Sequence, residues 1–220
     1  MSSSSSSPTP ARRRRRLALP VVLAGSIASL ILALGLSPTV AAFTASIQNT
    51  INTAGAGSLI MQENDSTGQI VCKSTDGASG VSTNSATCST INKYGGDLAM
   101  APGQTVTTNI PILNAGTLDA KGFTLTPGAC TQSASSTVYG SATDLCSQMK
   151  IKITSGAFVL YDGTVAGLSS TIDILDKVGA SSLPAGSSAT FTFAVTLPST
   201  LDASYSNLKV SQPLTWTFSS

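Results

Sequence analysis

Four cysteines carry the most reactive side chains of this sequence, and they fall into two pairs of equal spacing: Cys72 with Cys88, and Cys130 with Cys146. Thiols persist as disulfides where the compartment is oxidising. Three connectivities are open to four cysteines. Equal spacing and the Ser/Thr/Gly-rich segments inside each pair favour the two local bridges, each contributing about 3 kcal/mol in the chain-entropy model. A metal site is disfavoured, because no C-x-x-C pair and no histidine accompanies them.

The lack of histidine removes most hydrolytic machinery. A chain without histidine cannot build an H-E-x-x-H zinc site, a Ser/His/Asp triad or a Cys/His pair. Carboxylate catalysis through Asp162, Asp173 and Asp176 is a hypothesis, but solvated turn and helix-surface positions explain these residues more simply. Glu63 and Asp65 lack the spacing of a calcium loop. The sequence therefore predicts no catalytic residue, no metal site and no cofactor.

The first 42 residues have the order of an export signal. A basic run, Arg12–Arg16, precedes the apolar stretch Leu17–Leu36, and Val40-x-Ala42 offers the small residues that a signal peptidase accepts. We expect a signal peptide over 1–42 with cleavage between Ala42 and Phe43. A retained signal anchor is the alternative, because roughly 20 apolar residues span a hydrocarbon core. Both interpretations place the rest of the chain outside the cell or on its surface.

Residues 43–220 have the composition of an extracellular β protein. They hold seven lysines, ten acidic residues and no arginine, with abundant Ser, Thr, Gly and Ala. A mildly acidic chain offers no basic surface to phosphate backbones, so nucleic-acid binding is not expected. The length suits one domain with a core, and its loops near 72–88 and 130–146 would be stapled by the disulfides.

Period-two alternation of apolar and polar residues dominates this part of the chain and predicts half-buried strands. The first strand opens the mature chain, with Phe43, Ala45, Ile47 and Ile51 on one face. Further strands are expected near 58–61, 70–72, 106–112, 123–125, 149–153, 191–197 and 214–218. Trp216, the one tryptophan, is expected in the core. Many strands with little helix indicate a sandwich or barrel, and we predict a single all-β sandwich.

Two further features interrupt or repeat this pattern. Only 168–178 has helical spacing, with Ser169 and Ser170 as caps, and it predicts one short helix. A turn is expected at 114–117, where Asn and Gly can take positive φ. In addition, Pro102-Gly103 followed by a strand and Thr117-Leu118-Asp119-Ala120 is echoed by Ala185-Gly186, a strand and Thr200-Leu201-Asp202-Ala203. A duplicated hairpin and convergent turns explain this echo equally well.

Several short motifs follow one another in an order that resembles the TasA/camelysin family of Gram-positive secreted proteins. They span most of the mature chain: Ala41-Ala42-Phe43-Thr44, Met100-Ala101-Pro102-Gly103, Asn114-Ala115-Gly116-Thr117-Leu118, Leu183-Pro184-Ala185-Gly186, Phe191–Pro198, and Tyr205 ahead of the last strand. The cysteine loops depart from the family pattern, and the usual residues after Tyr205 are not clearly present.

The resemblance implies a jelly-roll-like sandwich, export through a dedicated signal peptidase, and assembly into biofilm fibres. In such fibres an N-terminal strand completes the neighbouring subunit's sheet, and the matching segment here is Phe43–Asn52. An ordinary intramolecular edge strand is the alternative for this segment. Some family members are described as metalloproteases.

The function that we expect from the sequence is therefore structural: an extracellular matrix, biofilm-fibre or surface-layer subunit whose partners are copies of itself. It would meet the membrane only through its N-terminal segment. A monomeric adhesin or ligand-binding module is the first alternative. A secreted hydrolase is the second, and the absence of any recognisable catalytic constellation argues against it.

Overall fold

The computed structural model describes residues 53–77 and 83–220. The predicted leader 1–42, its cleavage pair Ala42 and Phe43, and the expected first strand with Phe43, Ala45, Ile47 and Ile51 lie outside the described residues. Within Ala54–Ser220 the described residues form one compact unit. No helix in 53–77 or 83–220 is both long and apolar enough to cross a bilayer.

Antiparallel strands make up most of the described chain, and two short α-helices and a 3-10 turn connect them. The strands and helices in chain order are β1 (Met61–Asn64), β2 (Val71–Lys73), β3 (Thr105–Asn114), β4 (Gly122–Pro127), β5 (Thr131–Ala134), α2 (Leu145–Gln148), β6 (Lys150–Ser155), β7 (Phe158–Thr164), β8 (Ile172–Asp173), α3 (Ile174–Val178), β9 (Ser188–Thr196), η1 (Ala203–Tyr205), β10 (Leu208–Ser211) and β11 (Leu214–Ser219).

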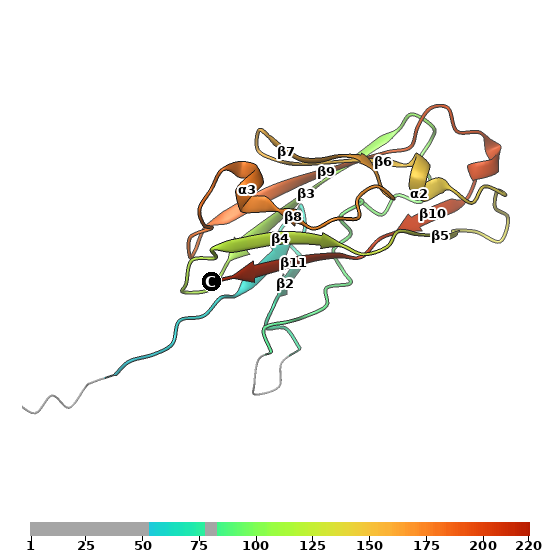
Figure 1. The fold of residues 1–220 in the computed structure, drawn as a ribbon. Coiled ribbons are helices and arrows are strands. Elements are labelled where there is room, and N and C mark those ends of the chain that lie inside the picture. The colour runs from blue at the N-terminus through green and yellow to red at the C-terminus, as the bar shows by residue number, and fades with distance from the viewer. Residues whose placement is uncertain (1–52, 78–82) are drawn as a thin grey trace, which may run out of the picture. The chain divides into compact units, whose positions relative to one another are not determined.

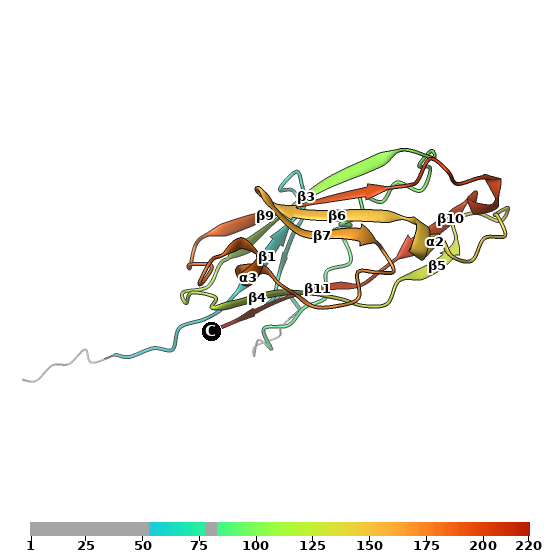
Figure 2. The same cartoon turned by 45° about the horizontal axis from the view of Figure 1, so that its top comes forward.

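The strands form three sheets. Six strands join in the order β2-β1-β3-β9-β6-β7, three in the order β11-β4-β8, and β10 pairs with β5. Every pairing is antiparallel. Figures 1 and 2 show β4 and β11 as a layer beneath β3, β9 and β6. The prediction of a mostly β fold is confirmed, and its sheets are antiparallel.

Aromatic side chains fill the space between these two layers. Strand β9 alternates as the sequence predicts, with Phe191 and Phe193 fully buried. The ring of Phe191 lies 4.6 Å from that of Trp216 on β11 and 5.5 Å from that of Phe123 on β4. Phe123 also packs edge-on against Phe218 at 4.7 Å. Aromatic pairs at these separations add about 0.5–1.5 kcal/mol each beyond area burial, so this cluster joins the two sheets.

The echoed Pro-Gly and Ala-Gly segments lead into two strands that pair with each other, β3 and β9, and lie at opposite ends of that pair. Gly103 and Gly186 precede β3 and β9 with φ of 88° and 76°, a left-handed conformation that favours glycine. Each donates its backbone N–H to the far end of the other strand: Gly103 to the carbonyl of Leu197 at 2.7 Å, and Gly186 to the carbonyl of Asn114 at 2.8 Å. The two turns therefore fix the register of the central β3–β9 pair from both ends.

The predicted short helix is present within 168–178, but its extent and its caps differ from the prediction. Only Ile174–Val178 is helical, because the Asp173 side chain caps that turn by accepting the N–H of Asp176 and Gly179 ends it at φ 68°. Ser169 and Ser170 are not its caps. Ile172 belongs to β8. A second short helix, α2, was not predicted, and neither were strands β5, β7 and β10.

The turn at 114–117 forms for a different reason from the one predicted. Neither Asn114 nor Gly116 has a positive φ. Glycine is needed at 116 because a Cβ there would collide with the backbone oxygen of Ser58. Asn114 is fully buried and donates its side-chain amide to the carbonyls of Leu118 and Leu183, at 2.8 and 3.0 Å, and accepts the N–H of Gly116. A buried amide, rather than a left-handed residue, organises this turn.

Replacing Asn114 by alanine should destabilise the protein by about 3 kcal/mol, because it leaves buried carbonyls without donors. Asn109→Ala is the matched control in the same strand. Asn109 is exposed and accepts a single hydroxyl bond from Thr192, so its loss should cost less than about 1 kcal/mol. Urea denaturation measures both, and equal losses would contradict the role of Asn114.

Candidate functional site

The four cysteines form two disulfides, Cys72–Cys88 and Cys130–Cys146, each with a sequence separation of 16. This is the local pairing that their spacing favours. The described residues contain no free cysteine. Two closed disulfides indicate that the protein folds in an oxidising compartment.

The acidic residues considered for chemistry have structural partners. Asp162 on β7 lies 3.5 Å from Lys152, and Asp173 caps α3. Asp65 closes the turn between β1 and β2, where hydrogen bonds from the Thr67 hydroxyl and the Ile70 N–H lower the pKa of its carboxyl group. Among residues 53–77 and 83–220, no three His, Cys, Asp or Glu side chains lie close enough to hold a metal ion.

The most distinctive feature of the described chain is a strand edge that faces open grooves. Among the described strands, β10 pairs only with β5, and β11 pairs only with β4. Two cavities adjoin the other edge of these strands. The first, of about 410 Å³, follows residues 205–214, and the second, of about 540 Å³, follows 213–218. We call the two cavities together the edge groove.

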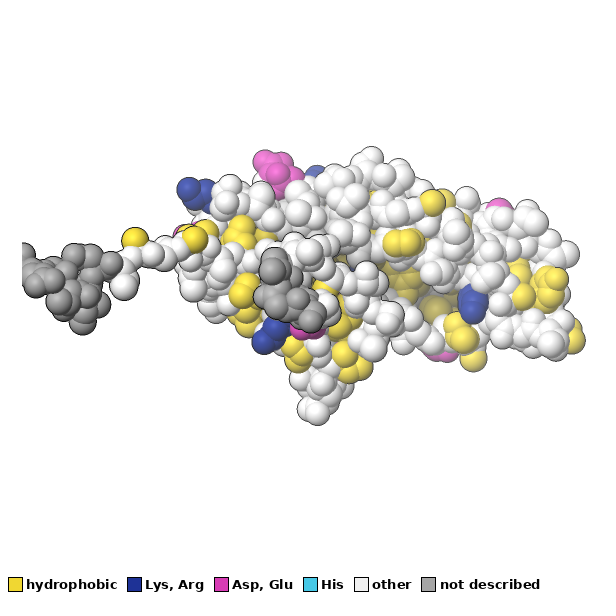
Figure 3. All heavy atoms as spheres, turned by 90° about the horizontal axis from the view of Figure 1, so that it is seen from below, with side chains coloured by type: hydrophobic (Ala, Val, Ile, Leu, Met, Phe, Trp, Pro, Cys, Tyr) yellow, Lys and Arg dark blue, Asp and Glu magenta, His cyan; other side chains and the backbone are white. Residues whose placement is uncertain are grey.

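The two cavities are continuous along the chain and share Cys88, Lys93, Pro213 and Leu214 in their walls. Every residue from 205 to 218 lines one cavity or the other. Figure 3 looks at the molecule from below and shows apolar side chains set into a recess of a mostly uncharged surface. The apolar side chains that line the first cavity include Ile91, Met100, Met149, Leu197, Leu208 and Val210.

The wall opposite β10 and β11 is the irregular segment 83–104, which contains no strand. Its Tyr94 hydroxyl donates to the Gln212 side-chain oxygen at 2.6 Å, and the Gln212 amide donates to the carbonyls of Gly128 and Leu168. Burial raises the pKa of Tyr94 far above its ordinary value, so this hydroxyl stays protonated and keeps donating. The bond ties the segment to the junction of β10 and β11.

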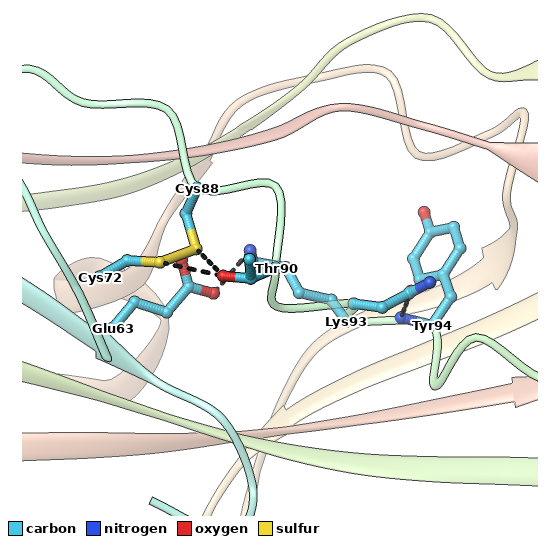
Figure 4. A network of polar contacts seen from close by, with 7 residues as sticks. Glu63, Cys72, Cys88, Thr90, Lys93 and Tyr94 are labelled. Atoms are coloured by element: carbon cyan, nitrogen blue, oxygen red, sulfur yellow. Dashed lines mark hydrogen bonds and ion pairs between the residues drawn. A yellow bond between two sulfur atoms is a disulfide. The ribbon is translucent and has the colours of Figure 1, made fainter. Parts of the chain in front are cut away.

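An ion pair and a disulfide fasten the same segment to β1 and β2, as Figure 4 shows. Lys93 Nζ lies 2.6 Å from Glu63 Oε1, and each side chain is only 10% exposed. The Thr90 hydroxyl lies 3.7 Å from Cys72 Sγ and 3.6 Å from Cys88 Sγ. The wall therefore depends on one covalent and several polar contacts rather than on a β-ladder.

Trp216 belongs to both the core and the edge groove. Its ring packs against Phe191 and Phe193, and it also lines the second cavity. Its Nε1 is buried without a hydrogen-bond partner among the described residues. As the one tryptophan of the sequence, it makes intrinsic fluorescence a direct reporter of this cavity.

A strand edge that pairs with none of the described strands, beside a groove lined by both apolar and polar side chains, has a definite chemical capacity. The edge presents a row of backbone donors and acceptors, and an extended segment can pair with it while alternate side chains enter the cavities. The apolar residues Leu214, Trp216 and Phe218 alternate along β11 with the exposed Thr215 and Thr217. The arrangement is suited to binding a strand.

Sequence reasoning identified β11 and the cysteines but missed the edge groove. Strand β10 is only four residues long, and the wall 83–104 has no periodic pattern. The one available signal was the closeness of Cys88 to the isolated apolar Ile91, which is buried. A cysteine next to a buried residue in a polar segment indicates that the segment is fastened to the core.

Removing one member of the Lys93–Glu63 pair should be costly. Lys93→Met leaves a poorly solvated carboxylate unpaired and should destabilise the protein by about 3 kcal/mol, while the double variant Lys93→Met/Glu63→Leu should recover most of that loss. Lys152→Met, in the exposed pair with Asp162, should cost less than about 1 kcal/mol. Chemical denaturation of the three variants checks this order. A Lys93→Met loss no larger than that of Lys152→Met would contradict it.

No family model matches this sequence, and no curated protein matches it significantly. The resemblance to TasA/camelysin proteins therefore rests on short motifs. What the edge groove binds has to be inferred from its geometry and chemistry.

Proposed function

We propose that this protein is an exported structural subunit whose copies join by strand addition into extracellular fibres, a biofilm matrix or a surface layer. The observation that carries the proposal is the edge of β10 and β11 beside the edge groove, which pairs with none of the described strands. A strand edge of this kind is a template for pairing with another chain, and monomeric proteins commonly cover or charge such edges. Here β11 has Thr215 and Thr217 at its exposed positions, and Lys209 on β10 is the one charged residue of the two strands.

Two further observations support this function. Two antiparallel layers joined by an aromatic cluster agree with the jelly-roll-like sandwich that the TasA/camelysin resemblance implies. Both disulfides agree with a location outside the cell, after release by a signal peptidase.

The strand donated to the edge groove is Phe43–Asn52 of a second copy. Ten extended residues span about 33 Å, which is comparable with the length of an edge formed by β10 and β11. Its apolar face, made of Phe43, Ala45, Ile47 and Ile51, would enter the cavities, and its polar face would meet solvent. A donor strand from one end and an acceptor groove on the body give an open, head-to-tail chain of subunits.

A monomeric ligand-binding module is the second candidate function. The mixed lining of the first cavity favours it, because a cavity of about 410 Å³ that combines aliphatic side chains with polar groups such as Asn92, Tyr94 and Gln212 has the size and character of a small-molecule site. A module of this kind would stay monomeric with an intact donor segment.

Charging the apolar face of the donor should abolish assembly. Ile47→Asp/Ile51→Asp would place carboxylates in the cavities, where their desolvation is unfavourable. Ser46→Asp/Gln48→Asp adds the same charge to the polar face and is the matched control. Electron microscopy of protein recovered from the medium should show fibres for wild type and control, and single subunits for Ile47→Asp/Ile51→Asp. A monodisperse monomer of wild type would refute the proposal and leave the ligand-binding module.

Charging the acceptor edge should produce a complementary defect. Thr215→Lys/Thr217→Lys places cations on the exposed positions of β11 without touching the core and should block strand addition. Thr107→Lys, on the exposed face of the central strand β3, is the control and should still assemble.

Mixing the two defective variants distinguishes strand addition from other association. The acceptor-defective chain keeps its donor, and the donor-defective chain keeps its groove. Sedimentation velocity should find monomers of each alone and one-to-one dimers of the mixture. Absence of dimers in the mixture would contradict donation of Phe43–Asn52 to the edge groove.

A further inference from the structure

We propose that closing the Cys72–Cys88 disulfide completes the edge groove, so that the protein becomes able to accept a strand only after oxidation outside the cytoplasm. This inference rests on the proposed function for its consequence, assembly. Its structural part, a wall held by the disulfide, stands on the geometry of the described residues.

Cys88 lies at the centre of the edge groove. It lines both cavities, and so does Lys93, five residues later. Between them Ile91 is 8% exposed and lines the first cavity. The position of residues 88–93 therefore decides the width of both cavities at the point where they meet.

The interactions other than the disulfide that hold this part of the wall are polar. Segment 83–104 belongs to none of the described strands. Asn84 donates its side-chain amide to the carbonyl of Leu59 and accepts the hydroxyl of Ser74, Lys93 pairs with Glu63, and Tyr94 donates to Gln212. Between Asn84 and Lys93, the Cys72–Cys88 bond is the covalent attachment to the sheet. Without this bond, the chain from Asn84 to Lys93 is a loop held at its two ends by polar contacts, and ordering its centre costs loop-closure entropy.

The second disulfide provides an internal comparison. Cys130–Cys146 closes a loop of the same sequence separation, 16, but neither cysteine lines the edge groove. In the chain-entropy model both bonds restrict the unfolded chain to the same extent. If removing one disulfide weakens strand binding more than removing the other, the difference must therefore arise in the folded wall and not in the unfolded chain.

The chemical step is thiol–disulfide exchange. In the reduced chain, the thiolate of one cysteine attacks the disulfide of an oxidant and forms a mixed disulfide with it. The thiolate of the second cysteine then attacks the sulfur of the first, and the oxidant's second thiol leaves. The two cysteines lose two electrons and two protons, one S–S bond forms between them, and the oxidant leaves as a dithiol. Cys72 and Cys88 are partly exposed, and their neighbours Val71, Lys73 and Ser89 are exposed. An oxidant, or a reductant in the reverse reaction, can therefore reach both sulfur atoms.

The device has a clear use for a protein that assembles with itself. A reduced chain inside the cell would carry a donor segment but no ordered acceptor. Oxidation after export would then order the acceptor groove, so that assembly begins outside the cell.

The experiment uses the donor-defective full chain, Ile47→Asp/Ile51→Asp, as a monomeric host whose groove is open. The probe is a synthetic peptide with the sequence of Phe43–Asn52. Cys72→Ser/Cys88→Ser and Cys130→Ser/Cys146→Ser are compared in this host, with binding followed by Trp216 fluorescence. We expect the first pair to weaken peptide binding by at least about tenfold, because ordering the loop consumes binding free energy, and the second pair to change it by less than about threefold.

Chemical reduction of the folded protein gives the same comparison, because it opens one disulfide in a variant that retains only that bond. In the Cys130→Ser/Cys146→Ser host, dithiothreitol should weaken binding by at least about tenfold, as Cys72→Ser/Cys88→Ser does, and reoxidation should restore it. In the Cys72→Ser/Cys88→Ser host, dithiothreitol should change nothing further. Equal binding by both cysteine variants, or binding that survives reduction of Cys72–Cys88, would overturn the inference.

Hydrogen exchange separates this inference from the proposed function. Residues 88–94 should exchange faster in Cys72→Ser/Cys88→Ser than in Cys130→Ser/Cys146→Ser, whether or not peptide is present. If the fully oxidised host fails to bind the peptide, the proposed function is wrong, and faster exchange at 88–94 still upholds the disulfide-held wall. Equal exchange in the two variants would overturn the inference, whatever the peptide does.

Discussion

The packing of Trp216 against Phe191 and Phe193 of the facing strand β9 is the interaction on which the rest of the structure depends. It fixes β11 against the six-stranded sheet, and Phe123 on the neighbouring strand β4 contacts both Trp216 and Phe218. Side chains on one face of a strand can be buried while its edge stays unpaired, because backbone hydrogen bonds and side chains point in perpendicular directions. The core thus holds β11 rigidly in place and leaves its edge available to another strand.

The opposite side of the edge groove is built on different physics. Segment 83–104 contributes one buried isoleucine, and its other attachments are a disulfide, an ion pair and hydrogen bonds such as those of Asn84, Tyr94 and Gly103. Elements with few buried apolar contacts open at low free energy. One side of the edge groove is a rigid wall of strands, and the other is a segment fastened at separate points. The groove can therefore widen to admit an extended segment without disturbing the core. This contrast links the fold to the proposed assembly.

Alternation in the sequence predicted the strands that line the core, because along β3, β6, β9 and β11 the less exposed side chains alternate with the more exposed ones. It failed where burial comes from irregular chain. Leu168, Ile172 and Leu175 are all buried, as their spacing indicates, yet only Leu175 is helical. The edge groove could not be predicted, because its walls are far apart in sequence and one of them, 83–104, is aperiodic. The equal cysteine spacing nevertheless pointed to the two bonds that the structure contains.

The reciprocal bonds of Gly103 and Gly186 restrict how this sequence can diverge. Inserting or deleting one residue in β3 or β9 would separate a glycine from its carbonyl and turn the following side chains to the opposite face. A compensating length change in the partner strand would be needed at once. Length variation among descendants of this chain should therefore gather in the two cysteine-closed loops, while the central strand pair keeps a constant number of residues.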